Sequence, residues 1–77
     1  MTLRDLPSGS AVRVREVLGP RPLRQRLGGL GIHPGDLVEV VQATILGGPM
    51  LIQVHGAEVA LGHEQADLVV VDPPEPG

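Results

Sequence analysis

The sequence predicts an all-β domain: a small SH3-like barrel of five strands, with one short helix after the first strand and a helical turn before the last. Three observations predict this fold. The chain has only 77 residues, several short segments alternate apolar and polar residues, and one segment repeats its leucines at helical spacing. Alternation with a period of two indicates strands with one buried face, and a sheet of short strands must curl to cover its edges.

The first strand is predicted at residues 11–17, because valines and arginines alternate there. Val12 and Val14 are expected to point inward, and the arginines between and after them outward, as in a sheet with one wet face. Before this strand lies a short lead-in. Its Leu3 and Leu6 are expected to pack back onto the core.

The helix is predicted from the leucines that follow the first strand. Leu23, Leu27 and Leu30 stand at i, i+4 and i+7, which places them on one stripe of a helix. We expect the helix to end at about Gly29. Gly31 follows where a left-handed cap residue is usually needed.

Four further strands are predicted after the helix, at residues 37–42, 50–55, 59–61 and 68–71. Val38, Val40, Ile52 and Val54 are expected to face the core. A single helical turn at residues 62–66 precedes the last strand.

The predicted domain spans residues 1–72. The remaining residues, 73–77, form a proline-rich tail that cannot continue a ladder and is expected to be disordered.

The composition excludes several classes of site. The chain has no cysteine, so it has neither a disulfide nor a thiolate metal site, and it has no aromatic ring on which a base could stack. All six basic residues are arginine and the formal net charge is −3, which argues against nucleic acid as a partner. No apolar run approaches the roughly 20 residues of a membrane span, and the first residues show no signal pattern. We therefore expect a cytoplasmic protein without direct membrane insertion.

Several short motifs follow one another in a fixed order over residues 3–71. They are Leu6-Pro-Ser-Gly9, Leu23-x-x-x-Leu27-x-x-Leu30-Gly31-Ile32-x-Pro34-Gly35-x-x-Val38-x-Val40, Gly48-Pro49-Met50, and Val59-Ala60-Leu61 ahead of Ala66-x-Leu68-x-Val70. In this order the chain resembles the FeoA family, small cytosolic accessory proteins of bacterial ferrous iron transport.

The resemblance implies a non-enzymatic binding module without a cofactor, whose partner is the cytosolic GTP-binding part of a FeoB-type permease. It carries over no catalytic residue. Similar modules form the C-terminal domains of iron- and manganese-dependent repressors, so the alternative is a metal-responsive or peptide-binding regulatory module. The metal-contacting segment of those repressors matches Pro20 to Leu23 here, where proline, arginine and leucine cannot ligate iron.

Three arginines around the predicted helix, Arg21, Arg24 and Arg26, are candidates for binding a partner. Arginine offers rigid bidentate donors and is enriched at protein interfaces. These residues form either a solvated helix face or a contact surface for an acidic partner. An arginine finger that completes a GTPase site is a further alternative, although such a residue usually lies on a loop and Arg24 lies mid-helix.

Leu46, Met50 and Leu51 are candidates for an exposed apolar patch next to the helix, which would serve as a docking site or for weak self-association. Core packing is the alternative, because a small barrel needs every large side chain that it has. Leu51 is the best candidate of the three, since Ile52 and Val54 define the inward face.

Metal binding and nucleophilic catalysis find little support in the sequence. His33, His55 and His63 are the only imidazoles, and none has a second ligand at the spacing of a metal site, so we expect solvated histidines and no metal. Ser8 and Ser10 lie near a turn, and no histidine pattern indicates that either is activated.

Overall fold

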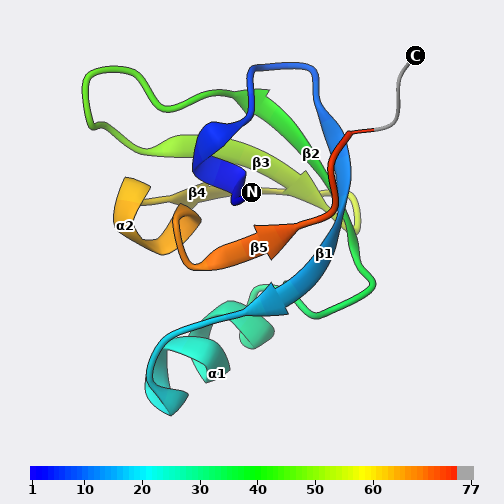
Figure 1. Cartoon of the computed structure of the whole chain (residues 1–77), viewed down its shortest axis with the longest axis vertical. Coiled ribbons are helices and arrows are strands. Elements are labelled where there is room, and N and C mark those ends of the chain that lie inside the picture. Colours follow the sequence, from blue (N-terminus) through cyan, green and yellow to red (C-terminus); the bar gives the residue numbers. More distant parts are fainter. Residues whose placement is uncertain (75–77) are drawn as a thin grey trace.

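The computed structural model describes residues 1–74, and its centre is a five-stranded antiparallel sheet with the strand order β4-β3-β2-β1-β5 (Figure 1). Along the chain the elements are the short 3-10 helix η1 (Leu3–Asp5), β1 (Ala11–Val17), α1 (Arg21–Gly29), β2 (Leu37–Gln42), β3 (Met50–Val54), β4 (Ala57–Leu61), α2 (His63–Ala66) and β5 (Val69–Val71). The predicted strands, helix and helical turn all occur in the predicted order. The bounds of the strands lie within two residues of the predicted ones.

β1 is the strand about which the sheet bends. Its first half pairs with β2, where Val12 lies opposite Val38, and its second half pairs with β5. The register shifts between Val14 and Glu16, and a bulge of this kind bends and twists the strand that carries it. The sheet therefore curves, and its strands surround the core (Figure 1).

The sheet does not close on itself, so the predicted barrel is not confirmed. β4 and β5 are the two outer strands and do not pair with each other. β5 is only three residues long, and α2 occupies the connection between them. The N-terminal segment covers the edge of β5 instead: Thr2 forms a bridge with Val70, and the Val71 amide donates to the Met1 carbonyl at 3.0 Å. An edge that is paired in this way does not need closure of a barrel to protect it.

The core is aliphatic throughout. No polar or charged side chain among the described residues is buried. The buried side chains are those of Leu3, Leu6, Val12, Val14, Leu27, Ile32, Val38, Val40, Met50, Ile52, Val54, Leu61, Ala66, Val69 and Val71. All the strand residues predicted to face inward are among them, and so are the two leucines of the N-terminal lead-in.

Helix α1 ends in a Schellman motif that fixes how the helix packs. Gly31 has a φ of 93°, the left-handed conformation predicted at this glycine. The Ile32 amide donates to the Leu27 carbonyl at 3.1 Å, and the Gly31 amide donates to the Gly28 carbonyl at 3.0 Å. Leu27 and Ile32 are buried and Leu23 packs against the core, so this apolar side of α1 is anchored. No helix of the described residues is long and apolar enough to cross a membrane.

Two expectations about burial are wrong. Met50, predicted in an exposed patch, is fully buried, because a period of two places it on the same face as Ile52 and Val54. Leu30, predicted on the buried stripe, is 41% exposed. The helix ends at Gly29, one residue before Leu30, and the chain turns away at Gly31. Ile32 therefore fills the buried position instead.

The division into a domain at 1–72 and a tail at 73–77 stays a prediction. Pro73 and Pro74 are exposed and lie outside regular secondary structure, and 75–77 lie outside the described residues.

Met50 and Leu46, both predicted to bind a partner, give a matched test of the packing. Met50→Ala is expected to lower the free energy of unfolding by about 2–5 kcal/mol, because it leaves a cavity in the core. Leu46→Ala is expected to change it by no more than about 0.5 kcal/mol, because Leu46 is fully exposed. Urea unfolding followed by far-UV circular dichroism measures both values. Equal losses for the two variants would contradict this packing.

Candidate functional site

Helix α1 exposes its three arginines but divides them between two faces. Arg21 and Arg24 are three residues apart and therefore lie on one side of the helix. Arg26 is two residues beyond Arg24, which turns it about 200° around the helix axis. Arg21 and Arg24 line one shallow pocket, whose other lining residues are Gln25, Gly28 and His33. Arg26 lines a separate pocket with Leu23 and two prolines. The structure thus brings together two of the three predicted arginines.

Among residues 1–74, the arginines outside α1 have partners within the molecule and those on α1 have none. Their partners are the Asp67 carboxylate for Arg4 at 3.8 Å, the Gly35 carbonyl for Arg13 at 3.1 Å and the Asp72 carboxylate for Arg15 at 3.5 Å. Within residues 1–74, Arg21, Arg24 and Arg26 form no ion pair and no side-chain hydrogen bond.

Asp36 connects two histidines from different parts of the chain. Its Oδ2 accepts a hydrogen bond from the His33 backbone amide at 2.8 Å and lies 3.2 Å from Nδ1 of the same histidine. Its Oδ1 lies 3.0 Å from Nε2 of His55. His55 and Gly56 form the two-residue turn between β3 and β4, where φ is 51° and 77°, as in a type I′ hairpin. The carboxylate therefore links the turn before β2 to the β3–β4 hairpin.

The same contacts hold Asp36 in its charged form. The hydrogen bond from the His33 backbone amide lowers the pKa of the Asp36 carboxyl, although partial burial opposes it. The side-chain hydrogen bond with His33, and the charge and hydrogen bond of His55, lower this pKa further. The Asp36 side chain is 20% exposed, whereas those of His33 and His55 are exposed as predicted.

The ring of His33 lies against helix α1 at Gly28. A Cβ placed on Gly28 would come within 3.2 Å of Nε2 of His33, so glycine permits this close approach. Nδ1 faces Asp36, which leaves Nε2 as the nitrogen turned toward the helix. His33 is thus held from one side by a carboxylate and presented on the other to the pocket of Arg21 and Arg24.

Sequence reasoning did not find this arrangement. The sequence does contain one usable signal, the run His33-Pro-Gly-Asp36, since an aspartate can accept hydrogen bonds from a turn that it closes. The link to His55 spans 19 residues and depends on how the hairpin packs, so no local pattern indicates it.

The histidines and serines do not assemble into a metal or nucleophile site. His33 and His55 bond to different oxygens of Asp36, and in the described part of the chain no group of three or more His, Cys, Asp or Glu side chains could hold a metal ion. Ser10 Oγ donates to the Pro7 carbonyl, and Ser8 Oγ accepts from the Ala43 amide. The Ser10 contact lies within one turn, whereas the Ser8 contact joins two segments that are 35 residues apart.

The three apolar candidates do not gather into one patch. Leu46 is fully exposed with a φ of 53°, Leu51 is half-buried, and Met50 is part of the core. The β2–β3 loop that carries Leu46 and helix α1 lie at opposite ends of the molecule (Figure 1). The expected apolar patch beside the helix is therefore absent among the described residues.

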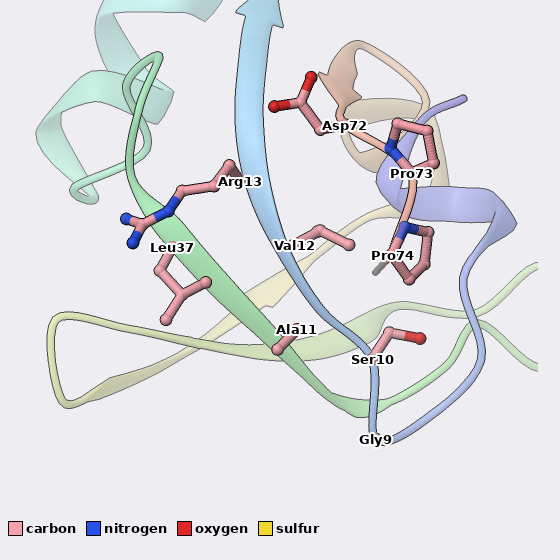
Figure 2. Close-up of a pocket in the computed structure, with 9 residues that line it drawn as sticks. All are labelled: Gly9, Ser10, Ala11, Val12, Arg13, Leu37, Asp72, Pro73 and Pro74. Carbon is pink, nitrogen blue, oxygen red and sulfur yellow. The ribbon is translucent and has the colours of Figure 1, made fainter. Parts of the chain in front are cut away.

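A further groove lies beside the first half of β1, where it faces the chain that follows β5 (Figure 2). The Arg13 guanidinium extends away from Asp72 and from the two proline rings (Figure 2). Both charged groups have partners elsewhere, the Gly35 carbonyl for Arg13 and Arg15 for Asp72. This groove therefore brings together no set of free polar groups that would orient a ligand.

The pKa of Asp36 predicts a pH-dependent contribution to stability. Since this pKa is lower in the folded protein, the contribution is fully present above the unfolded pKa of about 3.9 and is lost as the pH falls through the folded value. The difference in unfolding free energy between the wild type and Asp36→Asn is therefore expected to have its full value above about pH 5 and to shrink below about pH 4.

Urea unfolding from pH 2 to pH 7 measures this difference. Glu39→Gln is the control, because Glu39 is exposed and forms no side-chain hydrogen bond among the described residues. Parallel curves for the wild type and Asp36→Asn across this range would contradict the assigned role of the carboxylate.

Comparison with known proteins places the fold and the family. The sequence-family model described as the FeoA domain matches residues 1–73 of this chain. The crystal structure of an iron uptake regulatory protein, FeoA, superposes with a TM-score of 0.86 at 31% identity, over 92% of this chain and 93% of that one. FeoA from Stenotrophomonas maltophilia, solved in complex with zinc, is 36% identical, with a TM-score of 0.82 over 94% of this chain and 89% of that one. No curated protein matches.

The S. maltophilia protein is described as a prokaryotic SH3 domain protein and as a candidate activating factor of bacterial ferrous iron transport, which agrees with the predicted SH3-like fold. A manganese-dependent transcriptional repressor in complex with manganese also superposes, with a TM-score of 0.84 over 91% of this chain and 35% of the repressor. At 19% identity this likeness shows the fold alone. The family model covers nearly the whole chain, and on that ground the chain belongs to the FeoA family.

Proposed function

We propose that this protein is a non-enzymatic, cytoplasmic accessory of ferrous iron transport that acts by binding the cytosolic GTP-binding part of a FeoB-type permease. Membership of the FeoA family supports a role in ferrous iron transport. The description of the S. maltophilia relative as a candidate transport activating factor supports the accessory character of that role.

The observation that carries the binding function is the set of three exposed guanidinium groups on α1 without partners among residues 1–74. An arginine that is free in the isolated protein can form bidentate hydrogen bonds to a partner without first breaking an internal contact. Both serine hydroxyls form hydrogen bonds with the backbone and the chain has no cysteine, which supports a binding role rather than nucleophilic catalysis.

Arg21, Arg24 and Arg26 are the proposed centre of the interface. Leu46 and Leu51 remain candidates for a second contact or for self-association, and Met50 is withdrawn because it is buried. The opposite placement of α1 and the β2–β3 loop means that one small partner surface would not touch both (Figure 1). The repressor-like alternative finds no specific observation in its favour, since the likeness to repressors lies in the fold.

The first test is binding of the full chain to the purified cytosolic domain of the permease, by isothermal titration calorimetry with and without guanine nucleotide. We expect a complex in at least one nucleotide state, with a Kd of roughly micromolar strength, as is common for a small transient interface. Absence of binding in every nucleotide state would contradict the proposed function.

The second test is GTP turnover by that domain with and without this protein. Arg24 lies within a helix whose core side is anchored by Leu27, so it cannot enter a neighbouring active site as a loop arginine does. We therefore expect no acceleration of the kind supplied by an arginine finger, which is about 10³–10⁵-fold. An acceleration of that size that Arg24→Gln abolishes would contradict this expectation.

A further inference from the structure

Positive charge is concentrated in one short part of the chain. Residues 17–35 contain three arginines and one histidine but no aspartate or glutamate, although the whole chain has nine acidic residues. All nine acidic residues therefore belong to the rest of the molecule. The segment comprises α1 and its two connections, and α1 lies at one end of the molecule (Figure 1).

This arrangement does not stabilise the helix itself. Arg21 and Arg24 stand at i and i+3, where like charges repel each other by a few tenths of a kcal/mol. The first turn of α1 contains no acidic residue and Pro20 supplies no side-chain cap, so the positive end of the helix dipole is also uncompensated. The arginines therefore remain available for a group outside the chain.

One shallow pocket is lined by several side chains that can donate hydrogen bonds. Arg21, Arg24 and Gln25 stand at i, i+3 and i+4 of α1, and His33 belongs to the turn after the helix. The hydrogen bond to Asp36 and the close approach at Gly28 fix the orientation of the His33 ring, so its Nε2 faces the helix. Because Nδ1 faces Asp36, Nε2 is the nitrogen of His33 that can meet an anion, and it donates when the ring is protonated.

We propose that the pocket of Arg21, Arg24, Gln25 and His33 binds side-chain carboxylates of a short acidic segment on a protein partner. This inference rests on the proposed function, because the segment is expected to belong to the cytosolic part of the permease. Two arginines and a histidine provide bidentate and single donors of the kind that carboxylates accept.

A protein segment fits this pocket better than RNA or an anionic membrane. The helix is nine residues long, so the cationic surface extends only about 14 Å. A long polyanion that covers this surface would also approach the acidic remainder of a chain whose net charge is −3. A few carboxylates in one segment can occupy the pocket without meeting that repulsion.

The experiment titrates the full chain with hexaglutamate and follows the backbone amides by NMR, at low salt and again at 0.5 M NaCl. We expect shifts at residues 21–28 and at His33, weaker binding at high salt, and no shifts in the β2–β3 loop. The double variant Arg21→Gln/Arg24→Gln is expected to bind hexaglutamate about five- to tenfold more weakly, as the loss of two exposed charge pairs implies.

The matched control is Arg4→Gln/Arg15→Gln, which removes the same charge from arginines that already have carboxylate partners. Retained binding in this control, with loss in the α1 variant, supports the proposal. Equal losses in both variants would overturn it, because they would indicate a general effect of net charge. Inorganic phosphate binding to the pocket as tightly as hexaglutamate would overturn the assignment to carboxylates.

The same two double variants are then tested against the cytosolic domain of the permease. Loss of binding in the α1 variant alone supports the proposal. If the domain binds the wild type and the α1 variant equally, this inference fails and the proposed function stands. If the domain does not bind the wild type although hexaglutamate does, the proposed function fails and the acidic segment belongs to another protein.

Discussion

The packing of Leu27 and Ile32 into the aliphatic core is the interaction on which the rest of the structure depends. The Leu27 carbonyl accepts the hydrogen bond from the Ile32 amide that ends α1, so the same two residues anchor the helix and terminate it. With its apolar side fixed in this way, α1 exposes its arginines to solvent. The turn that follows then brings His33 back against the helix, where Asp36 holds its ring. The candidate site is therefore a consequence of how the helix ends.

The molecule separates the residues that stabilise it from those that we assign to binding. The buried side chains are aliphatic, and among the described residues the Thr44 hydroxyl is the one buried side-chain polar atom that lacks a hydrogen-bond partner. A chain of this length buries a limited share of its surface and is marginally stable, and the charges on α1, which have no partner among residues 1–74, do not strengthen the fold. A small fold that exposes the arginines of α1 as a contact surface is consistent with an accessory protein.

Much of the fold follows from local patterns, because strand alternation and helix caps are encoded by neighbouring residues. The inward valines of β1 and β2 are of this kind, and Gly31 adopts the left-handed conformation that its position after the leucines indicates. The burial of Met50 could have been predicted too, since it shares the parity of Ile52. Whether the sheet closes could not be predicted from local patterns. It depends on whether the outer strands β4 and β5 pair with each other or whether the N-terminal segment covers the edge of β5 instead.

Some features of the candidate site could likewise be predicted from the sequence, and others could not. The 200° between Arg24 and Arg26 follows from helix geometry alone, so their separation into two pockets was available from the sequence. The link from Asp36 to His55 could not be predicted from the sequence, because it forms only when the β3–β4 hairpin packs beside the turn before β2. His33 gains its position from the same turn, so its place beside the arginines required the structure.

The most direct measurement of the central claim is hydrogen exchange of this protein, free and in complex with the cytosolic domain of the permease. The account predicts slower exchange in α1 and in the turn at His33, with unchanged exchange in the β2–β3 loop. Protection confined to that loop, with α1 unaffected, would contradict it.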